Sequence, residues 1–130
     1  MSTRFAGKAD FFTVYIREAH PSDEWQMDSN VEQGICYPQP TTLEDRLVIA
    51  RDFVARHEWQ MPLLVDDMQN QIDSVYAGWP ERLYVVDRDG RIAYKGKTGP
   101  FGFFPEEVEA WLEQRFPDVP ARAPDADATR

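Results

Sequence analysis

Cysteine is nearly absent from this sequence: its 130 residues include a single one, Cys36. An intrachain disulfide is therefore excluded, which fits a reducing compartment. Long apolar runs are missing too, since segments such as Leu63–Val65 are far too short to span a bilayer. The N-terminal stretch MSTRFAGKAD carries basic residues but no apolar h-region, so no secretory signal is visible. We therefore expect a cytoplasmic protein with no membrane association.

Positive charge is scarce and scattered. Lys and Arg number 14 against 23 Asp and Glu, which gives a formal net charge of −9. We do not expect nucleic acid as a partner, because phosphate binding relies on clustered Lys and Arg. The ligand spacing of a His/Cys metal site is also missing. Asp66 and Asp67 could suggest a metal together with Glu18, but a strand end and a helix cap explain them, so we expect no metal.

What is present points to one compact domain. The chain is 42% hydrophobic and 13% aromatic, which excludes a disordered protein. The segment Asp10–Ile16, DFFTVYI, is dense in β-branched and aromatic residues and lacks a helical stripe. It predicts a strand buried on both faces, as in a parallel sheet. A polar loop with three prolines follows over Pro21–Pro40, and loops of that length are uncommon without a function.

The second half predicts alternating elements. Thr41 and Glu44 have capping-box spacing for a helix that runs to about His57, a residue we interpret as structural. The expected apolar face of this helix holds Leu43, Leu47, Ala50 and Val54. We then predict a strand at Pro62–Val65 and a helix that is capped by Asp67 and ends at Gly78. A hairpin of Arg82–Asp87 and Arg91–Lys95 follows, with its turn at Asp89-Gly90. The last predicted elements are a helix from Pro105 to Phe116 and a disordered tail over 117–130.

This order of strands and helices predicts an α/β fold and matches the back half of a thioredoxin-like domain. Such a domain opens with a central strand that carries a reactive cysteine to a helix N-terminus. Nothing before Asp10 supplies either element, and MSTRFAGKA is typical of the end of a helix. We therefore predict one thioredoxin-like domain over 1–116, a mixed sheet flanked by helices and truncated at its N-terminus.

Five stretches, in order from about Phe11 to Leu112, resemble the iodothyronine deiodinases, thioredoxin-fold enzymes that remove iodine from thyroid hormones with a selenocysteine. They are VYIREAHPSDEW, LEDRLVIA, DDMQNQ, PERLYVV and YKGKTGPFGFFPEEV. As in related peroxiredoxins, the resemblance implies a missing strand between Phe11–Ile16 and Leu83–Val86. It also implies that the family's Gly-Ser-Cys-Thr-Sec-Pro stretch lies upstream of Met1. Our hypothesis is that a selenocysteine UGA codon was taken as a stop, and translating the DNA upstream of Met1 tests it.

Glu18 and His20 are the candidate catalytic residues. They alternate with Arg17 and Ala19 at the carboxyl end of the first strand, the edge where parallel sheets build sites, so both are expected to leave the sheet on one side. A histidine can move a proton near neutral pH, and an adjacent glutamate can orient it. The resemblance implies that both residues are needed for catalysis, and that a second family histidine falls at about Pro40. The alternative is that both side chains only bond loop backbone.

Other candidates carry weaker signals. Trp25 and Trp79 could offer a flat apolar surface to an aromatic ligand or could belong to the core. Pro80 precedes a strand where thioredoxin-like proteins place a cis-proline facing the reactive cysteine, and we favour cis over an ordinary trans proline. We assign Trp25 and Pro80 to substrate binding. Cys36 has no basic neighbour in sequence, so we interpret it as a passive loop thiol.

Two functions of different class follow. The first is a deiodinase-like thiol or selenol oxidoreductase that reduces a halogenated aromatic or a peroxide, with a small-molecule substrate, a thiol reductant as co-substrate and no cofactor. Its nucleophile lies outside this chain, unless Cys36 serves as a one-cysteine peroxidase. The second is a non-catalytic thioredoxin-like remnant or binding domain. Unpaired strand edges predict marginal stability, rearrangement or a homodimer formed through the gap.

Overall fold

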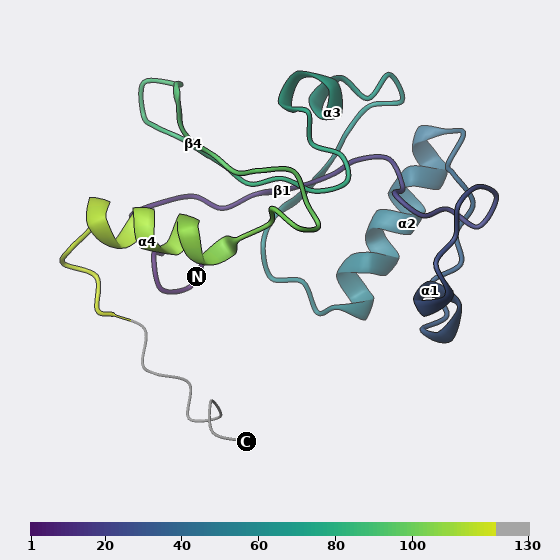
Figure 1. The fold of residues 1–130 in the computed structure, drawn as a ribbon, viewed down its shortest axis with the longest axis horizontal. Coiled ribbons are helices and arrows are strands. Elements are labelled where there is room, and N and C mark those ends of the chain that lie inside the picture. Colours follow the sequence, from purple (N-terminus) through teal and green to yellow (C-terminus); the bar gives the residue numbers. More distant parts are fainter. Residues whose placement is uncertain (122–130) are drawn as a thin grey trace.

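The computed structural model describes residues 1–121 and shows a mixed α/β arrangement (Figure 1). In chain order the elements are β1 (Thr13–Tyr15), α1 (Asp28–Glu32), α2 (Leu43–Arg56), β2 (Leu63–Val65), α3 (Gln71–Tyr76), β3 (Tyr84–Val86), β4 (Ile92–Lys95) and α4 (Pro105–Arg115). The predicted strands, hairpin and three longer helices are all present. The short helix α1, inside the long polar loop, was not predicted.

The strands form two separate sheets of two strands each. β1 pairs in parallel with β2, with Thr13 opposite Leu63. β3 pairs antiparallel with β4, with an irregularity between Val85 and Val86. Each described strand has one hydrogen-bonded neighbour, so the single mixed sheet that we predicted is divided into a parallel and an antiparallel half. The hairpin turn has Gly90 at φ 79°, a left-handed conformation that glycine adopts without strain.

The prediction that the first strand is buried on both faces is wrong. α2 covers one face of the β1–β2 sheet, where the rings of Tyr15 and Phe53 lie 6.4 Å apart. On the other face Val14 and its register partner Leu64 are exposed, as is Phe12 just before the strand. The apolar side chains of this strand suit a sheet that is covered on both faces. Among the described residues, only one face is covered.

Helix α2 begins one residue later than the capping box suggested. Thr42 is the N-cap, and its hydroxyl accepts a hydrogen bond from the Asp45 backbone N–H at 3.1 Å. The buried face is also rotated from the predicted one, since it consists of Arg46, Ile49 and Ala50 while Leu43 is exposed. A charged residue therefore occupies the core-facing stripe of this helix.

The start of α3 is held by Asp66 rather than mainly by Asp67. The Asp66 carboxylate accepts from the backbone N–H groups of Asp67, Ile72 and Asp73, while Asp67 accepts from Gln71. The predicted stop at Gly78 is also displaced. Ala77 takes the left-handed conformation at the C-cap, with φ 49°.

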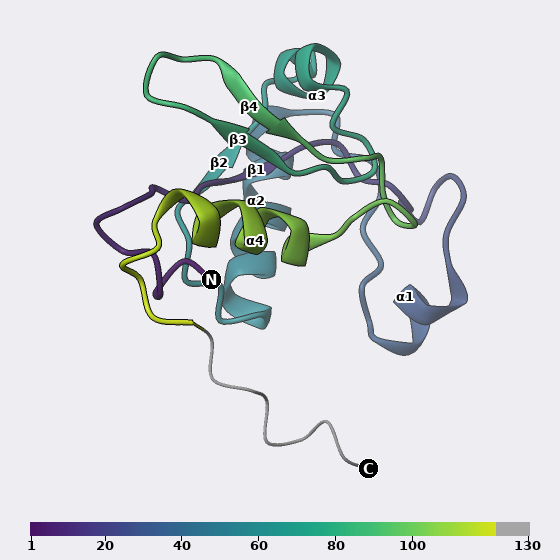
Figure 2. The same ribbon diagram turned by 60° about the vertical axis from the view of Figure 1, so that its left-hand side comes forward.

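The N-terminal segment packs against the C-terminal helix, as both views show (Figures 1 and 2). Phe5 is fully buried in a cluster with Val108 and Leu112 of α4. Arg4 reinforces this contact through ion pairs to Glu109 at 2.6 Å and to Glu113. The first nine residues are therefore an integral part of the domain.

The predicted tail divides in two. Within 117–121, Asp118 accepts from Lys8 at 2.6 Å and Val119 packs on the Phe5 cluster. The rest of the predicted tail, 122–130, lies outside the described residues. Among residues 1–121, no helix combines the length and the apolar character needed to cross a membrane.

Candidate functional site

A cavity of about 280 Å³ opens where the chain leaves β1. Three segments that are distant in sequence line it: residues 17–19 after β1, Gln39 and Pro40 before α2, and Arg46 within α2. The β2–α3 connection and Trp79 complete the wall. The cavity thus lies at the carboxyl end of the parallel pair, where such sheets build their sites.

Glu18 is the candidate catalytic residue that reaches this cavity. Its backbone is fixed by Gln39, whose side-chain amide accepts from the Glu18 N–H at 3.0 Å and donates to the Glu18 carbonyl at 3.2 Å. Its carboxylate oxygen Oε1 is buried and has no hydrogen-bond partner within the described chain. Burial raises the pKa of the carboxyl group above its usual value, and the positive charge of Arg46 opposes this in part.

Arg46 is a site residue that sequence reasoning missed. Its side chain is 2% exposed, yet it carries a charge. The guanidinium donates to the carbonyls of Asp66 and Asp67 at 3.2 and 2.6 Å, and to Asn70 Oδ1 at 2.9 Å, which ties α2 to the β2–α3 connection. The available signal was its spacing, because Arg46 stands three and four residues before Ile49 and Ala50 on one helical face.

His20 lies apart from the cavity lining. Its Nδ1–H donates to the carbonyl of Trp25 at 3.2 Å, and the two rings meet edge to face at 4.7 Å between centroids. This bond leaves Nε2 as the ring nitrogen available to a ligand. No hydrogen bond between Glu18 and His20 is formed in residues 1–121, so the structure brings only one member of the predicted pair into the cavity.

The aromatic candidates are at the surface. Trp25 is 71% exposed, which excludes a core role for it, although it does not line the cavity. Trp79 does line it, and the guanidinium of Arg17 stacks over its ring at 5.4 Å while pairing with Asp73 at 3.1 Å. The Trp79-Pro80 peptide bond is cis, as predicted, but Pro80 itself is outside the lining.

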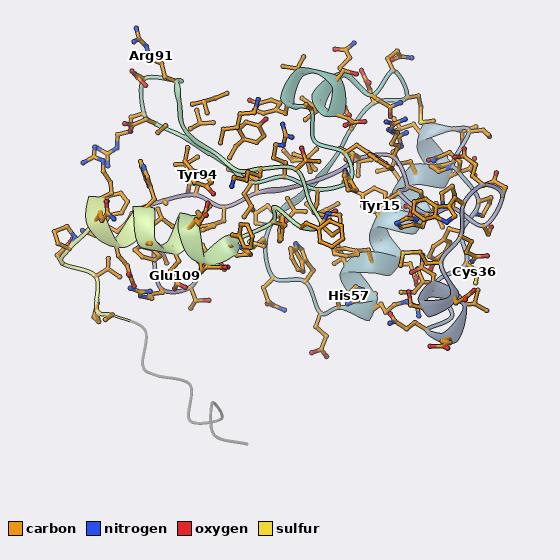
Figure 3. The ribbon with its side chains drawn as sticks, in the orientation of Figure 1. Tyr15, Cys36, His57, Arg91, Tyr94 and Glu109 are labelled. Atoms are coloured by element: carbon orange, nitrogen blue, oxygen red, sulfur yellow. The ribbon has the colours of Figure 1, made fainter. Side chains whose placement is uncertain are left out.

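The remaining candidates, Cys36 and His57, are not among the residues that line the cavity, and Figure 3 shows them beside α1 and at the end of α2. Cys36 is exposed on the loop beside α1, where its Sγ accepts a hydrogen bond from the Gln26 amide. His57 is the C-cap of α2, and its ring packs against Phe53 at 4.8 Å. Within residues 1–121, no cluster of three or more His, Cys, Asp or Glu side chains could hold a metal ion.

These groups define the chemistry available in the cavity. A carboxyl group with a raised pKa stays protonated nearer to neutral pH, so it can donate a proton or a hydrogen bond to a ligand. Arg46 adds a fixed positive charge, and Trp79 adds an aromatic edge. The arrangement suits a small ligand that gains a proton or carries negative charge.

Comparison with known proteins gives consistent results. The sequence model of the iodothyronine deiodinase family matches residues 1–116. The type I iodothyronine deiodinase of Xenopus laevis is 40% identical over 111 residues, covering 85% of this chain and 42% of that protein. The thyroxine 5-deiodinase of Sparus aurata is 42% identical over 115 residues, covering 86% of this chain and 40% of that protein. The chain thus spans about two fifths of the length of these relatives.

Proposed function

The chain belongs to the iodothyronine deiodinase family, and from that premise we propose that it forms part of an enzyme that reductively removes a halogen from an aromatic ring. The observation that carries the proposal is Glu18, whose buried Oε1 has no partner in a polar cavity and whose pKa is raised by burial. This carboxyl group supplies the proton. His20, which lies apart from the cavity lining and is oriented by Trp25, would contact a part of the substrate outside the cavity through Nε2.

The proposed reaction replaces the halogen on the ring by hydrogen and consumes two thiol groups of the reductant. A selenolate or thiolate takes the halogen from the ring carbon, which gains a proton, so an aryl–iodine bond is replaced by an aryl–hydrogen bond and a selenium– or sulfur–iodine bond. A thiol reductant displaces iodide from that bond and leaves a mixed disulfide or selenosulfide. A second thiol then releases the nucleophile and forms the oxidised disulfide. The two electrons that reduce the ring carbon therefore come from the thiol reductant.

The nucleophile belongs to a segment other than the Cys36 loop. Cys36 does not line the cavity that holds Glu18, and its one described partner is a neutral amide. A nucleophile must contact the ring carbon at which the proton is delivered, and Cys36 is outside the cavity lining that includes Glu18. The thiol of Cys36 therefore plays no part in the proposed reaction.

We propose that the α/β arrangement is thioredoxin-like, with room for a further strand between the two half-sheets. Two features support this: a parallel pair followed by an antiparallel hairpin, and described strands with only one neighbour each. The open edges also support a homodimer, because unpaired strand edges favour association. Light scattering of the purified chain tests the dimer.

The test uses a small-molecule selenol as an external nucleophile, with an iodinated phenol and dithiothreitol. Wild-type protein is expected to accelerate iodide release, and Glu18→Gln to lose about 10²-fold or more of that acceleration, as for removal of a general acid. Glu32→Gln makes the same change on α1, outside the cavity, and is expected to retain the rate.

Three outcomes would overturn the proposal. Equal rates for wild type and Glu18→Gln would remove the proton donor from the reaction. Turnover without the selenol that is abolished by Cys36→Ser would make Cys36 the nucleophile. Turnover of peroxide but not of the iodinated phenol would assign the chain to the peroxidases.

A further inference from the structure

Arg46 is a buried cation whose hydrogen-bonding capacity is only partly used. A guanidinium has five N–H donors. The described residues provide three acceptors, namely the carbonyls of Asp66 and Asp67 and the side chain of Asn70. The Nε–H is buried and without a partner. Arg46 lines the cavity, so the side chain that carries this unused donor is part of the cavity wall.

The charge of Arg46 also lacks a close counter-charge. Among residues 1–121, no carboxylate oxygen lies within 4.0 Å of its guanidinium nitrogens. Asp66 turns its carboxylate to the backbone N–H groups at the start of α3 and offers Arg46 only its carbonyl. A buried charge that is neither paired nor fully hydrogen-bonded is costly, and an anion in the cavity would offset that cost.

The second unsatisfied atom of the cavity is Glu18 Oε1. A protonated carboxyl group is a hydrogen-bond donor. Glu18 and Arg46 are not in ion-pair contact, although the charge of Arg46 opposes the rise in the pKa of Glu18, and both line the same cavity. The two unsatisfied groups therefore belong to side chains that line one cavity.

We propose that this cavity contains a binding site for a compact monovalent anion, a halide or a carboxylate, held by Arg46 Nε–H and by protonated Glu18. The anion site is inferred from these two unsatisfied groups, Arg46 Nε–H and the Glu18 carboxyl group, without reference to the proposed function. Its assignment to the iodide that dehalogenation releases rests on the proposed function. The cavity would then accept the product anion where the proton was delivered.

The other charged groups around the cavity set the pH dependence. Arg17 pairs with Asp73, and Glu24 lines the cavity from the exposed loop without an ion pair in the described chain. Asp66 and Asp67 direct their carboxylates to the backbone of α3. Glu18 therefore decides whether the cavity attracts an anion, because it repels one when ionised and donates to it when protonated. Binding is expected to weaken as pH rises.

The experiment follows the Arg46 Nε–H signal by ¹H–¹⁵N NMR during titration with sodium iodide or sodium acetate, at constant sodium with divalent sulfate as the replacing anion. We expect a saturable shift, with an affinity that is about tenfold or more higher near pH 5 than near pH 8, the size of one pKa unit of coupling. Saturation by iodide but not acetate identifies a halide site, and the reverse identifies a carboxylate site.

Variants separate binding from general salt effects. Glu18→Gln keeps a donor without the charge, so its affinity is expected to be high and independent of pH. Arg46→Gln is expected to abolish saturable binding, whereas Arg51→Gln, on the exposed side of the same helix, retains it. Because Arg46→Gln also removes three hydrogen bonds and could unfold the chain, the wild-type titration is decisive by itself.

A linear, unsaturable shift of the wild-type Arg46 signal overturns the anion site. So does saturable binding that Arg46→Gln leaves intact. The same samples separate this proposal from the proposed function. Anion binding without dehalogenation would support the anion site and contradict the proposed reaction. Dehalogenation without anion binding would support the reaction and contradict the anion site.

Discussion

Gln39 pairs its side-chain amide with both backbone polar groups of Glu18, 21 residues away in sequence. The amide accepts from one group and donates to the other, as a neighbouring strand would. Gln39 is itself held through its backbone N–H by Asp23, at 2.8 Å. The long loop therefore provides strand-like hydrogen bonds to the backbone beyond the end of β1. These bonds fix the position of Glu18, the residue that lines the cavity.

Replacing Gln39 is expected to release this segment. Gln39→Leu leaves the Glu18 N–H and carbonyl without their partner, so the free energy of unfolding should fall by about 1–3 kcal/mol. Urea denaturation measures it. Gln60→Leu removes an exposed amide that bonds only the Glu58 carbonyl, and it should change stability by less than about 0.5 kcal/mol. Equal effects of the two changes would contradict the role of Gln39.

Glu18 should make stability depend on pH in a defined direction. Folding raises its pKa above the ordinary 4.5, so the folded state favours the protonated form. The protonated form is fully populated below the ordinary value, and its contribution is lost as pH rises through the folded-state pKa. Wild type should therefore lose stability relative to Glu18→Gln as the pH rises above 4.5. Thermal melts of both proteins at several pH values measure this. A difference in melting temperature that stays constant as the pH rises would contradict the burial of Glu18.

The Phe5 cluster should dominate the stability of the C-terminal half. Phe5→Ala removes a fully buried ring from its contacts with α4, and a loss of about 3–5 kcal/mol is expected from the cavity it leaves. Phe101→Ala, at a ring that is 93% exposed, should be close to neutral. Denaturant unfolding of both variants measures the contrast.

The two adjacent threonines before α2 should differ in effect. Thr42→Ala removes the N-cap and should cost about 1 kcal/mol. Thr41→Ala removes a hydroxyl with no described role in the cap and should cost less than about 0.5 kcal/mol. The reverse order, measured by chemical denaturation, would show that the helix begins where the capping box first suggested.

Tyr94 should ionise late. Its hydroxyl donates to Glu107 at 2.6 Å, and this bond raises the pKa of Tyr94 from 10 to about 12. Glu107→Gln should return the pKa toward 10, as followed by tyrosinate absorbance with Tyr94→Phe as the reference. Glu106→Gln removes only a weaker repulsion and should lower it less. The stabilising effect of the bond is present below about pH 10 and is lost through about pH 12.

Local chemistry made several elements predictable. The Asp89-Gly90 pair specified the hairpin turn and Pro105 the start of α4, because each acts within a few residues. The cap of α2 was misplaced by one residue because Thr41 and Thr42 both precede a carboxylate at the right spacing. The predicted buried face of α2 was only partly right, because Ala50 is buried and Leu43 is exposed, and the alignment of the face depends on what lies beneath the helix.

The site was less predictable than the fold. Glu18 was found because it ends a strand, whereas Arg46 reaches the cavity through hydrogen bonds to Asp66, Asp67 and Asn70, more than 19 residues away. Residue type alone assigns a helical arginine to solvent. Only its position three and four residues before buried Ile49 and Ala50 distinguishes it.

The packing of Phe5 against α4 has a consequence for the order in which the molecule assembles. Arg4 and Glu109 are 105 positions apart in sequence, so the segment around Phe5 cannot complete its packing until α4 has been made. Contacts this distant in sequence must close a very long loop, which slows folding. Until α4 has been synthesised, Phe5 stays exposed on the nascent chain. A chaperone that binds apolar segments would therefore encounter the exposed Phe5 segment until α4 has emerged.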